Sequence, residues 1–370
     1  MKLQILVPQY KEDERVIGKL LDSIKMQRNI DFNDIGVIIV NDGSDIILKH
    51  SFLEDYPFRI DYIKNEHKGV SATRNRALKE ATADYIMFCD ADDMFYHSLA
   101  IQLILRECVN KKPDCLYSTF IEEVPDQKHP GKFLYNARQQ AFVFVHGKVY
   151  RREFLIENDI WWDEELTLHE DGYFNGLALG QIKKDNLIYC NEPFYMWCNN
   201  SESVSRKTPT FVLDTYDQNL IAQDRLITKL LPKNIYEAIN LTAIQLYQTY
   251  FLLTGTFVDL SKDEKQPEQF REKLAKELEN IDNMIATFYE KFKDCYRHVI
   301  KQERERLFLS TKGGASIFNN HDYKLEDFEN WLVEFKKKHN IEFDDTPIEL
   351  PKAEEKKDDN VIDAEVGEKK

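Results

Sequence analysis

Short apolar runs alternate with amphipathic stretches between Leu3 and about Val124. The apolar runs predict strands, and the stretches with helical periodicity predict helices that cover them. We expect strands at residues 3–8, 35–42, 59–64 and 84–90, and helices at 16–26 and 71–82. Strands that alternate with helices form βαβ units, so the pattern predicts an α/β fold with a mostly parallel central sheet.

Residues 114–200 have a mixed pattern that we place in the same domain, which then spans 1–210. The apolar runs in it predict further strands, and the periodic stretches predict two more helices. The expected strands are 115–120, 141–145 and 186–190, and the expected helices are 151–158 and 170–179.

Long amphipathic helices are expected beyond about Thr210, and they predict an all-α C-terminal domain at 211–345. Ser261 and Glu264 have the spacing of a capping box. The helical stretches are 212–231, 235–253, a Lys- and Glu-rich part of 267–306, and 325–339. Residues 346–370 mix charges with little apolar content and predict a disordered tail.

Composition fits a globular enzyme-sized protein. The 370 residues are 42% hydrophobic and 31% charged, and the net charge of -15 argues against binding nucleic acid over a broad face. The six cysteines are scattered without a C-x-x-C pair, which predicts neither a zinc site nor a disulfide framework and favours a reducing compartment.

The apolar stretches are too short for a signal peptide or a transmembrane segment. We therefore expect a cytoplasmic protein, either free or peripheral to the inner face of the membrane.

Carboxylates follow directly after the apolar strand expected at 84–90. Asp90, Asp92 and Asp93 would lie at the C-terminal edge of an α/β sheet, where such folds bind ligands. Hard oxygen ligands suit a divalent cation, which would neutralise the phosphates of a leaving nucleotide. A solvated acidic turn is the alternative, because D-x-D alone is a weak motif.

Two other strands end in polar or aromatic residues. Pro8 and Tyr10 follow the first strand, and Asp42 lies in an N-D-G turn after the second. Each is ordinary alone, but parallel strands would bring all of them to one edge of the sheet. Arg74, near the start of the next helix, is a candidate for binding a diphosphate, whereas Arg76 and Lys79 are expected to solvate the helix face.

A family resemblance rests on the order and spacing of six motifs along residues 1–205: VPQY (7–10), VNDGS (40–44), HKGVSATRN (67–75), FCDADD (88–93), HGKVYRREFL (146–155) and LHEDGYFN (168–175). Together they resemble family 2 glycosyltransferases, which are inverting enzymes of the GT-A fold. The resemblance leaves the helical C-terminal part unexplained.

The resemblance implies a role for each matching residue. Asp42 would read the base in a pocket with Pro8 and Tyr10, and Asp92 would ligate Mn²⁺ or Mg²⁺ under the diphosphate. Asp171 would be the general base that deprotonates the acceptor hydroxyl. The further donor-binding residues are Arg74, Asp90 (on the ribose or the metal) and Ala91, and the further donor or acceptor contacts are His146, Glu170 and Arg206.

Many members of the family have a histidine or arginine in a loop that helps to hold metal and diphosphate. The loop after Tyr195 has no histidine, and Arg206 or Lys207 could substitute electrostatically. Without the upstream motifs, Glu170 and Asp171 would read as acids that stabilise a helix N-terminus.

The resemblance implies a nucleoside diphosphate sugar donor, with a UDP-sugar as first choice, and a glycan, cell-surface polymer or its precursor as acceptor. The helical domain could form a homo-oligomer. Two alternatives stay open: a non-catalytic binding or scaffold protein of the same fold, and a glycosyltransferase that acts on a modified nucleic acid base. A nucleotidyltransferase ranks last, because residues 7–15 contain no glycine-rich phosphate loop.

Overall fold

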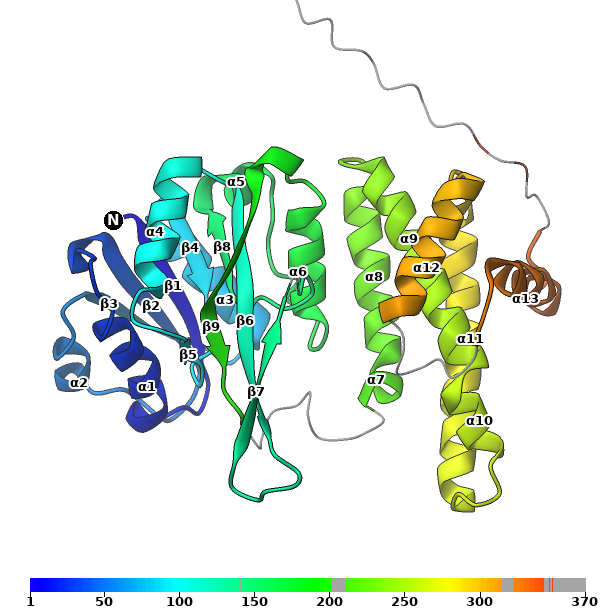
Figure 1. Ribbon diagram of the computed structural model, residues 1–370, viewed down its shortest axis with the longest axis horizontal. Helices are drawn as coiled ribbons and strands as arrows, with labels where there is room; N and C mark the ends of the chain where they lie inside the picture. The colour runs from blue at the N-terminus through cyan, green and yellow to red at the C-terminus, as the bar shows by residue number, and fades with distance from the viewer. Residues whose placement is uncertain (140, 201–210, 315–321, 343–345, 347, 349–370) are drawn as a thin grey trace, which may run out of the picture.

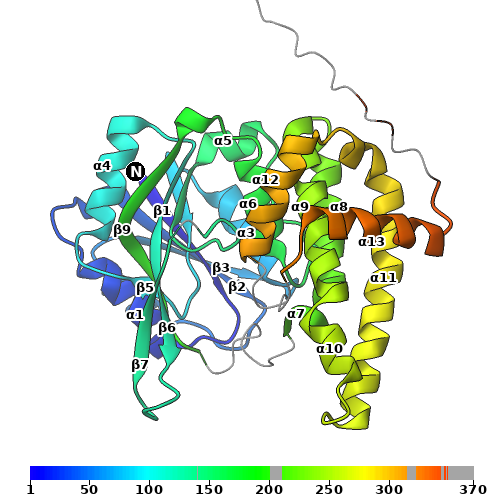
Figure 2. The same cartoon turned by 45° about the vertical axis from the view of Figure 1, so that its right-hand side comes forward.

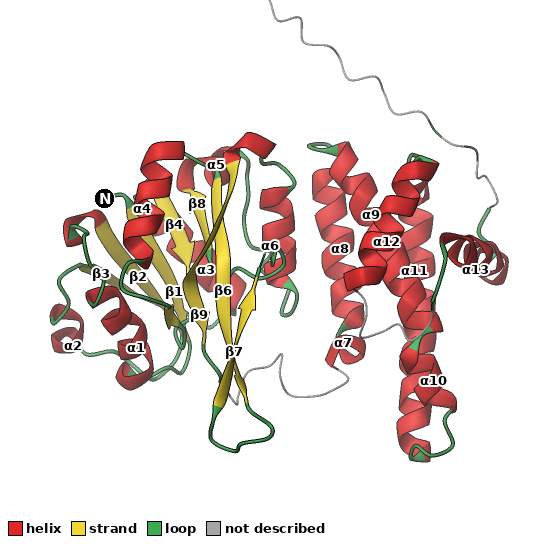
Figure 3. Cartoon of the chain, in the orientation of Figure 1, coloured by secondary structure: helices red, strands yellow, loops and turns green. Residues whose placement is uncertain are grey.

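A computed structural model describes residues 1–139, 141–200, 211–314, 322–342, 346 and 348. A mixed sheet with helices on its faces occupies one side of the molecule, and a group of helices occupies the other (Figures 1 and 3). The α/β fold and the helical C-terminal region expected from the hydrophobic pattern are both present.

Nine strands in the described residues form one sheet. The strands are β1 (Leu3–Gln9), β2 (Ile35–Asp42), β3 (Arg59–Asn65), β4 (Tyr85–Phe88), β5 (Met94–Phe95), β6 (Cys115–Pro125), β7 (Phe133–Arg138), β8 (Lys148–Arg151) and β9 (Leu187–Trp197). Their order is β3-β2-β1-β4-β8-β6-β9-β5, and β7 pairs with β6.

The four strands β3, β2, β1 and β4 run parallel, so their C-terminal ends meet at one edge. β8 is antiparallel to both β4 and β6, whereas β9 is parallel to β6. The antiparallel β6–β7 hairpin extends beyond the rest of the sheet (Figure 1). The parallel half therefore provides the ligand-binding edge, as in other open α/β sheets.

Helices cover both faces of the sheet, and β1 shows why. Leu3, Ile5 and Val7 point into the core on one side, while Leu6 points into the core on the other. This period-2 alternation between two apolar layers is expected of a strand buried on both faces. The first layer contains α1 (Glu14–Lys25) and α4 (Ala100–Lys111), and the second contains α3 (Val70–Glu80), α5 (Arg152–Glu157) and α6 (Glu170–Leu179).

Short elements complete this part of the chain. They are α2 (His50–Glu54) and the 3₁₀ turns η1 (Phe32–Asp34) and η2 (Lys184–Asn186).

The C-terminal helices pack around α9 (Ile235–Thr254), which is buried along most of its length. The others are α7 (Phe211–Asp214), α8 (Tyr216–Leu230), α10 (Thr256–Lys262), α11 (Glu268–Arg297), α12 (Lys301–Gly314) and α13 (Leu325–Lys338), with α13 lying across the group (Figure 2). None of the helices in the described ranges is long and apolar enough to cross a membrane.

α8 packs closely against α6. A Cβ atom on Gly176 would lie 2.5 Å from Leu226 Cδ2, so the two helices approach at a position that only glycine fills without a shift. The Arg225 guanidinium pairs with Asp163 at 2.9 Å, and the apolar core continues from the sheet into the helices. The domain boundaries at 210/211 and 345/346 stay predictions, and the expected tail lies almost wholly outside the described residues.

Two expectations about local structure are wrong. Residues 141–145 form no strand, because their backbone groups bond to side chains instead: Ala141 O and Phe144 O accept from the Lys148 ammonium, and Val145 N donates to Asp171. Ser261 does not cap a helix start; its hydroxyl donates to Val258 O inside α10. α11 begins later, at Glu268.

Candidate active site

A pocket of about 410 Å³ lies at the C-terminal ends of β1, β2 and β4. Parallel pairing brings these three strand ends together although they are far apart in sequence. Of the residues singled out in the sequence, it is lined by Pro8, Tyr10, Asp42, Arg74, Asp90, Ala91 and Asp92. The strand-end residues thus share one cavity.

Asp42 is buried at the end of β2 and holds the loop before α3. Its Oδ1 accepts from Lys68 N at 2.8 Å, and its Oδ2 accepts from Gly69 N at 3.0 Å and lies 2.8 Å from His67 Nδ1. The His67 ring stacks on Tyr10, with centroids 4.6 Å apart. Asp42 therefore forms part of the pocket wall, and its carboxylate is held in place by its contacts with the loop before α3.

Arg74 joins the pocket to the start of α6. Its side chain is 4% exposed, and its guanidinium contacts three carboxylates: Asp90 Oδ1 at 3.0 Å, Asp171 Oδ1 at 2.9 Å and Glu170 Oε1 at 3.3 Å. The guanidinium also lies over the Trp162 ring, 4.3 Å from its centroid. A buried cation with three anionic partners fixes the relative positions of these acids.

The charges of this cluster shift its pKa values in opposite directions. Burial alone would raise the pKa of Asp90, but Arg74 and His146 hold it well below its usual range. Burial, followed by the negative charge of Asp171, raises the pKa of Glu170 to about 7. Asp90 is thus held ionised, whereas Glu170 titrates near neutral pH.

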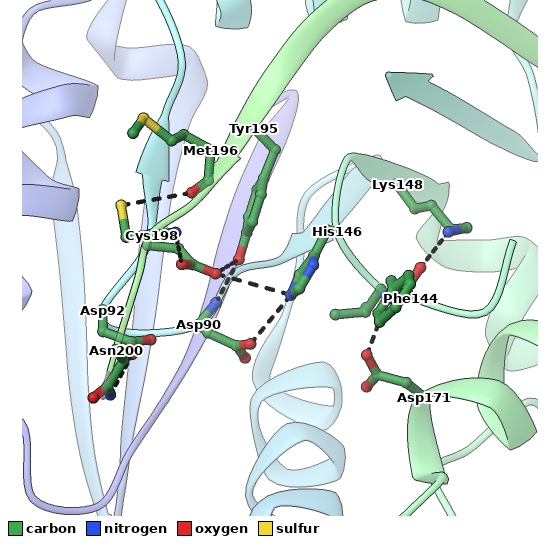
Figure 4. Close-up of polar contacts among 12 residues, drawn as sticks. Asp90, Asp92, Phe144, His146, Lys148, Asp171, Tyr195, Met196, Cys198 and Asn200 are labelled. Atoms are coloured by element: carbon green, nitrogen blue, oxygen red, sulfur yellow. Dashed lines mark hydrogen bonds and ion pairs between the residues drawn. The ribbon is translucent and has the colours of Figure 1, made fainter. Parts of the chain in front are cut away.

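Behind Asp90 lies a buried cage that contains His146 (Figure 4) and Asp93, whose Oδ2 is 3.9 Å from His146 Nε2. His146 Nε2 is 3.4 Å from Asp90 Oδ2, and its ring stacks on Tyr195 at 4.9 Å between centroids. Asp93 accepts hydrogen bonds from the Tyr195 hydroxyl and from Cys198 N. Burial, followed by the charge of Asp90, raises the pKa of Asp93 well above its ordinary value.

Asp92 is the second carboxylate of this motif that lines the pocket, beside Asp90. Its Oδ2 accepts from Asn200 Nδ2 at 2.8 Å. Burial and then the charge of Asp90 raise the pKa of Asp92. A divalent cation beside Asp92 and Asp90 would favour their ionised forms, and carboxylate oxygens are ligands that suit Mn²⁺ or Mg²⁺.

A second set of possible ligand atoms lies deeper. Among the described residues, Asp90, Asp93 and His146 offer one ligand atom each within 4.8 Å of one another. Asp93 is 1% exposed and already satisfied by Tyr195, and it does not line the pocket. The expectation that Asp92 ligates a metal ion stays a prediction beside this second candidate set.

The remaining predicted residues fall outside the pocket wall. Asp171 and Glu170 start α6 and reach the pocket only through Arg74, and His146 lies behind Asp90. Arg206 lies outside the described residues. The sequence analysis did not assign the supporting residues Trp162, Asn200 and Tyr195. It placed Asp93 at the strand end with Asp90 and Asp92 but gave it no role of its own.

Comparison with known proteins identifies the N-terminal part. Residues 4–157 match the family model described as Glycosyl transferase family 2. An uncharacterized glycosyltransferase, EpsJ of Bacillus subtilis (strain 168), is 27% identical over 55% of this chain and 62% of its own length. A teichoic acid poly(glycerol phosphate) polymerase of Staphylococcus epidermidis is 31% identical over 52% of this chain and 28% of its own length.

A third relative has solved structures. The poly(ribitol-phosphate) β-N-acetylglucosaminyltransferase TarS of Staphylococcus aureus (strain Mu50) is 28% identical over 55% of this chain and 37% of its own length. TarS 1–349 with UDP superposes with a TM-score of 0.57 at 19% identity, covering 90% of this chain and 92% of that one. The complex with UDP-GlcNAc gives 0.56 at 18%, covering 88% and 94%.

This chain spans less than two thirds of each of these three curated relatives. The shared fold extends into the helical region, and the matched motifs lie in the sheet and its pocket. Residues 4–157 of the chain therefore match glycosyl transferase family 2, and the chain has the GT-A fold.

Proposed function

We propose that this chain transfers a sugar from a UDP-sugar to a hydroxyl of a cell-wall polymer or its precursor, by one metal-assisted displacement that inverts the anomeric carbon. The observation that supports it best is the pocket at the ends of β1, β2 and β4, where Asp42, Asp90 and Asp92 line one cavity. The Arg74 guanidinium links this cavity to Asp171.

The donor would lie along the edge of the sheet. The base would bind between Tyr10 and Asp42, and the ribose would lie near Asp90, whose carboxylate Arg74 holds in place. A divalent ion bound by Asp92 would neutralise the diphosphate as negative charge builds up on it. Ala91, between the two acids, also lines the pocket.

Asp171 is the proposed general base. Its Oδ1 accepts from Arg74, and its Oδ2 accepts from Val145 N at 3.1 Å, so the carboxylate is held in one orientation. Each oxygen keeps a second lone pair that can accept the proton of an acceptor hydroxyl. The acceptor oxygen would bond to the anomeric carbon as its proton passes to Asp171. The bond to the diphosphate breaks on the opposite side, and its electron pair leaves with the phosphate.

The acceptor class rests on the relatives. The names of two of them refer to poly(ribitol-phosphate) and to teichoic acid poly(glycerol phosphate). The UDP-GlcNAc complex of TarS makes UDP-GlcNAc the first donor to test. The cytoplasmic location and the homo-oligomer expected from the sequence stay predictions.

The first experiment titrates the purified chain with UDP by calorimetry, with and without Mn²⁺. We expect binding that needs the metal in the wild type and is lost in Asp92→Ala. The matched control is Asp185→Ala, an exposed acid in η2 far from the pocket lining. Metal-independent binding that Asp92→Ala leaves intact would contradict the proposed donor site.

A second experiment tests the base. In Asp171→Asn, sugar transfer should fall by about 10²- to 10⁴-fold, the usual contribution of a positioned acid or base, while UDP affinity stays unchanged. Glu279→Gln, an exposed glutamate on α11, serves as the control and should leave transfer unchanged. Full activity in Asp171→Asn would assign the proton transfer to another group.

A further inference from the structure

Lys148, at the start of β8, is a buried cation to which the proposed reaction gives no task. Its side chain is 1% exposed, and among the described residues no carboxylate forms an ion pair with it. Burial lowers the pKa of Lys148 to about 8, so at pH 7 the amine keeps its proton. Burying a charge without a counter-ion costs free energy, and its hydrogen bonds are what offsets that cost.

The hydrogen bonds of the Lys148 side chain go to one short segment, residues 141–145. Its Nζ donates to Ala141 O at 2.8 Å and also to Phe144 O (Figure 4). The segment belongs to no strand or helix, so its carbonyl groups have no regular ladder of partners. The ammonium therefore holds the segment at two points.

A second side chain holds the same segment from α6. Asn175 Nδ2 donates to Val143 O at 2.6 Å, and Asn175 Oδ1 accepts from the Tyr150 hydroxyl at 2.6 Å. Tyr150 lies two positions after Lys148 on β8, so the two side chains lie on one face of that strand. Side chains on a strand and on a helix thus fix the segment together.

The end of the segment contacts the carboxylate of Asp171. The buried Val145 donates its N–H to Asp171 Oδ2 at 3.1 Å, and Arg74 donates to Oδ1 at 2.9 Å. The torsion that turns a carboxylate has broad minima, so a bond to one oxygen alone leaves its plane poorly fixed. Bonds to both oxygens fix that plane, and the second of them depends on where the segment holds Val145.

We propose that Lys148 is a positioning residue for Asp171 and acts through the 141–145 segment. The ammonium does not line the pocket, and its task is to keep the Val145 N–H on one oxygen of the carboxylate. This inference rests on the proposed function, in which Asp171 is the general base. A reacting group displaced by about 1 Å can cost on the order of 10²-fold in rate, so the task bears directly on the rate of transfer.

A double-mutant cycle separates positioning from support of the fold. If Lys148 acts through Asp171, its removal should cost little once Asp171 has been replaced, whereas general support would cost the same in both backgrounds. The variants are Lys148→Met, Asp171→Asn and their combination. Methionine keeps an unbranched apolar side chain and removes the donors. Asn175→Ala, which removes the other hold on the segment, takes the place of Lys148→Met in the cycle if that variant does not fold.

The matched control is Lys336→Met, because Lys336 is also buried, at 2% exposure, but lies on α13 in the helical region. Release of UDP from UDP-GlcNAc, with poly(ribitol phosphate) as acceptor, gives kcat and KM for each protein. Hydrogen exchange of the Val145 amide, followed by NMR, reports its bond to Asp171 without any need for activity. Calorimetry with UDP and Mn²⁺ shows whether the donor site is intact.

We expect Lys148→Met to lower kcat by about 10- to 100-fold, with KM for UDP-GlcNAc and UDP affinity unchanged. The Val145 amide should exchange about tenfold faster or more, because its partner is no longer held in register. In the Asp171→Asn background, the same substitution should change the residual kcat by less than about twofold. Lys336→Met should alter neither kcat nor the exchange of Val145.

Two results would overturn the inference alone: an unchanged exchange rate at Val145 in Lys148→Met, or an equal loss of kcat in both backgrounds. In these cases Asp171→Asn by itself still loses activity and UDP still binds, so the proposed function stands. A wild type that releases no UDP, or full activity in Asp171→Asn, contradicts the proposed function and removes the role assigned to Lys148 with it. The single variant Asp171→Asn and the wild type therefore tell the two failures apart.

Discussion

The titration of Glu170 should make the free energy of unfolding depend on pH. Its pKa is about 7 in the folded protein because of burial and the charge of Asp171, against an ordinary value of 4.5. At 1.36 kcal/mol for each tenfold change in proton affinity, this difference corresponds to about 3 kcal/mol. The side chain is 17% exposed, so solvent screening reduces this figure only in part.

The sign follows from the raised pKa. The folded protein binds the Glu170 proton more tightly than the unfolded chain does, so this contribution to stability is present below pH 4.5 and is lost as pH rises through 7. Glu170→Gln keeps the shape of the protonated acid and removes its titration. The variant should match the wild type near pH 4.5 and exceed it by up to about 3 kcal/mol at pH 8.

Urea unfolding at intervals from pH 5 to pH 8 measures this difference. The informative quantity is the free energy of unfolding of the variant minus that of the wild type, which cancels the titration of all other groups. Glu279→Gln, an exposed glutamate on α11, is the control and should give a difference that does not vary with pH. A flat difference for Glu170→Gln as well would refute the reasoning.

Three further substitutions test the cluster and its supports. Arg74→Gln leaves three carboxylates without their shared cation and should destabilise the fold by about 3–5 kcal/mol, measured by urea unfolding. Gly43→Ala puts a Cβ atom 2.5 Å from His67 N at a residue with a φ of +73°, so it should shift the loop that Asp42 holds and weaken UDP binding in calorimetry. Tyr195→Phe removes the hydroxyl that donates a hydrogen bond to buried Asp93 and should lower the unfolding free energy by about 1–3 kcal/mol. The loss should be largest at high pH, because the raised pKa of Asp93 delays its ionisation to that range and the ionised carboxylate needs the donor most.

The parallel half of the sheet could be predicted because its strands are buried on both faces. β2 has no exposed residue and reads as an unbroken apolar run, whereas all six residues of β7 are exposed and carry no pattern tied to a core. α4 did carry a signal, since Ala100, Ile101, Ile104 and Cys108 are buried at helical spacing, but the sequence analysis did not assign it.

The pocket at the ends of β1, β2 and β4 could be predicted for a similar reason. Parallel pairing alone brings Tyr10, Asp42 and Asp92 to one edge, so the order of strands determines the neighbours. The contact between Arg74 and Asp171 joins residues 97 positions apart on two helices. No local periodicity encodes such a contact, because it depends on how α3 and α6 pack against each other.

The bonds that Asp42 makes with the loop before α3 also bear on the choice of nucleobase. A carboxylate has about four lone-pair directions, and Lys68 N, Gly69 N and His67 Nδ1 already occupy three of them. One direction is left, which matches the single N–H of a uracil ring. Guanine presents two adjacent donors and would have to displace part of the loop to bond with both. Selectivity for UDP over GDP would then arise from the protein's own satisfied hydrogen bonds, and competition between the two nucleotides in calorimetry would measure it.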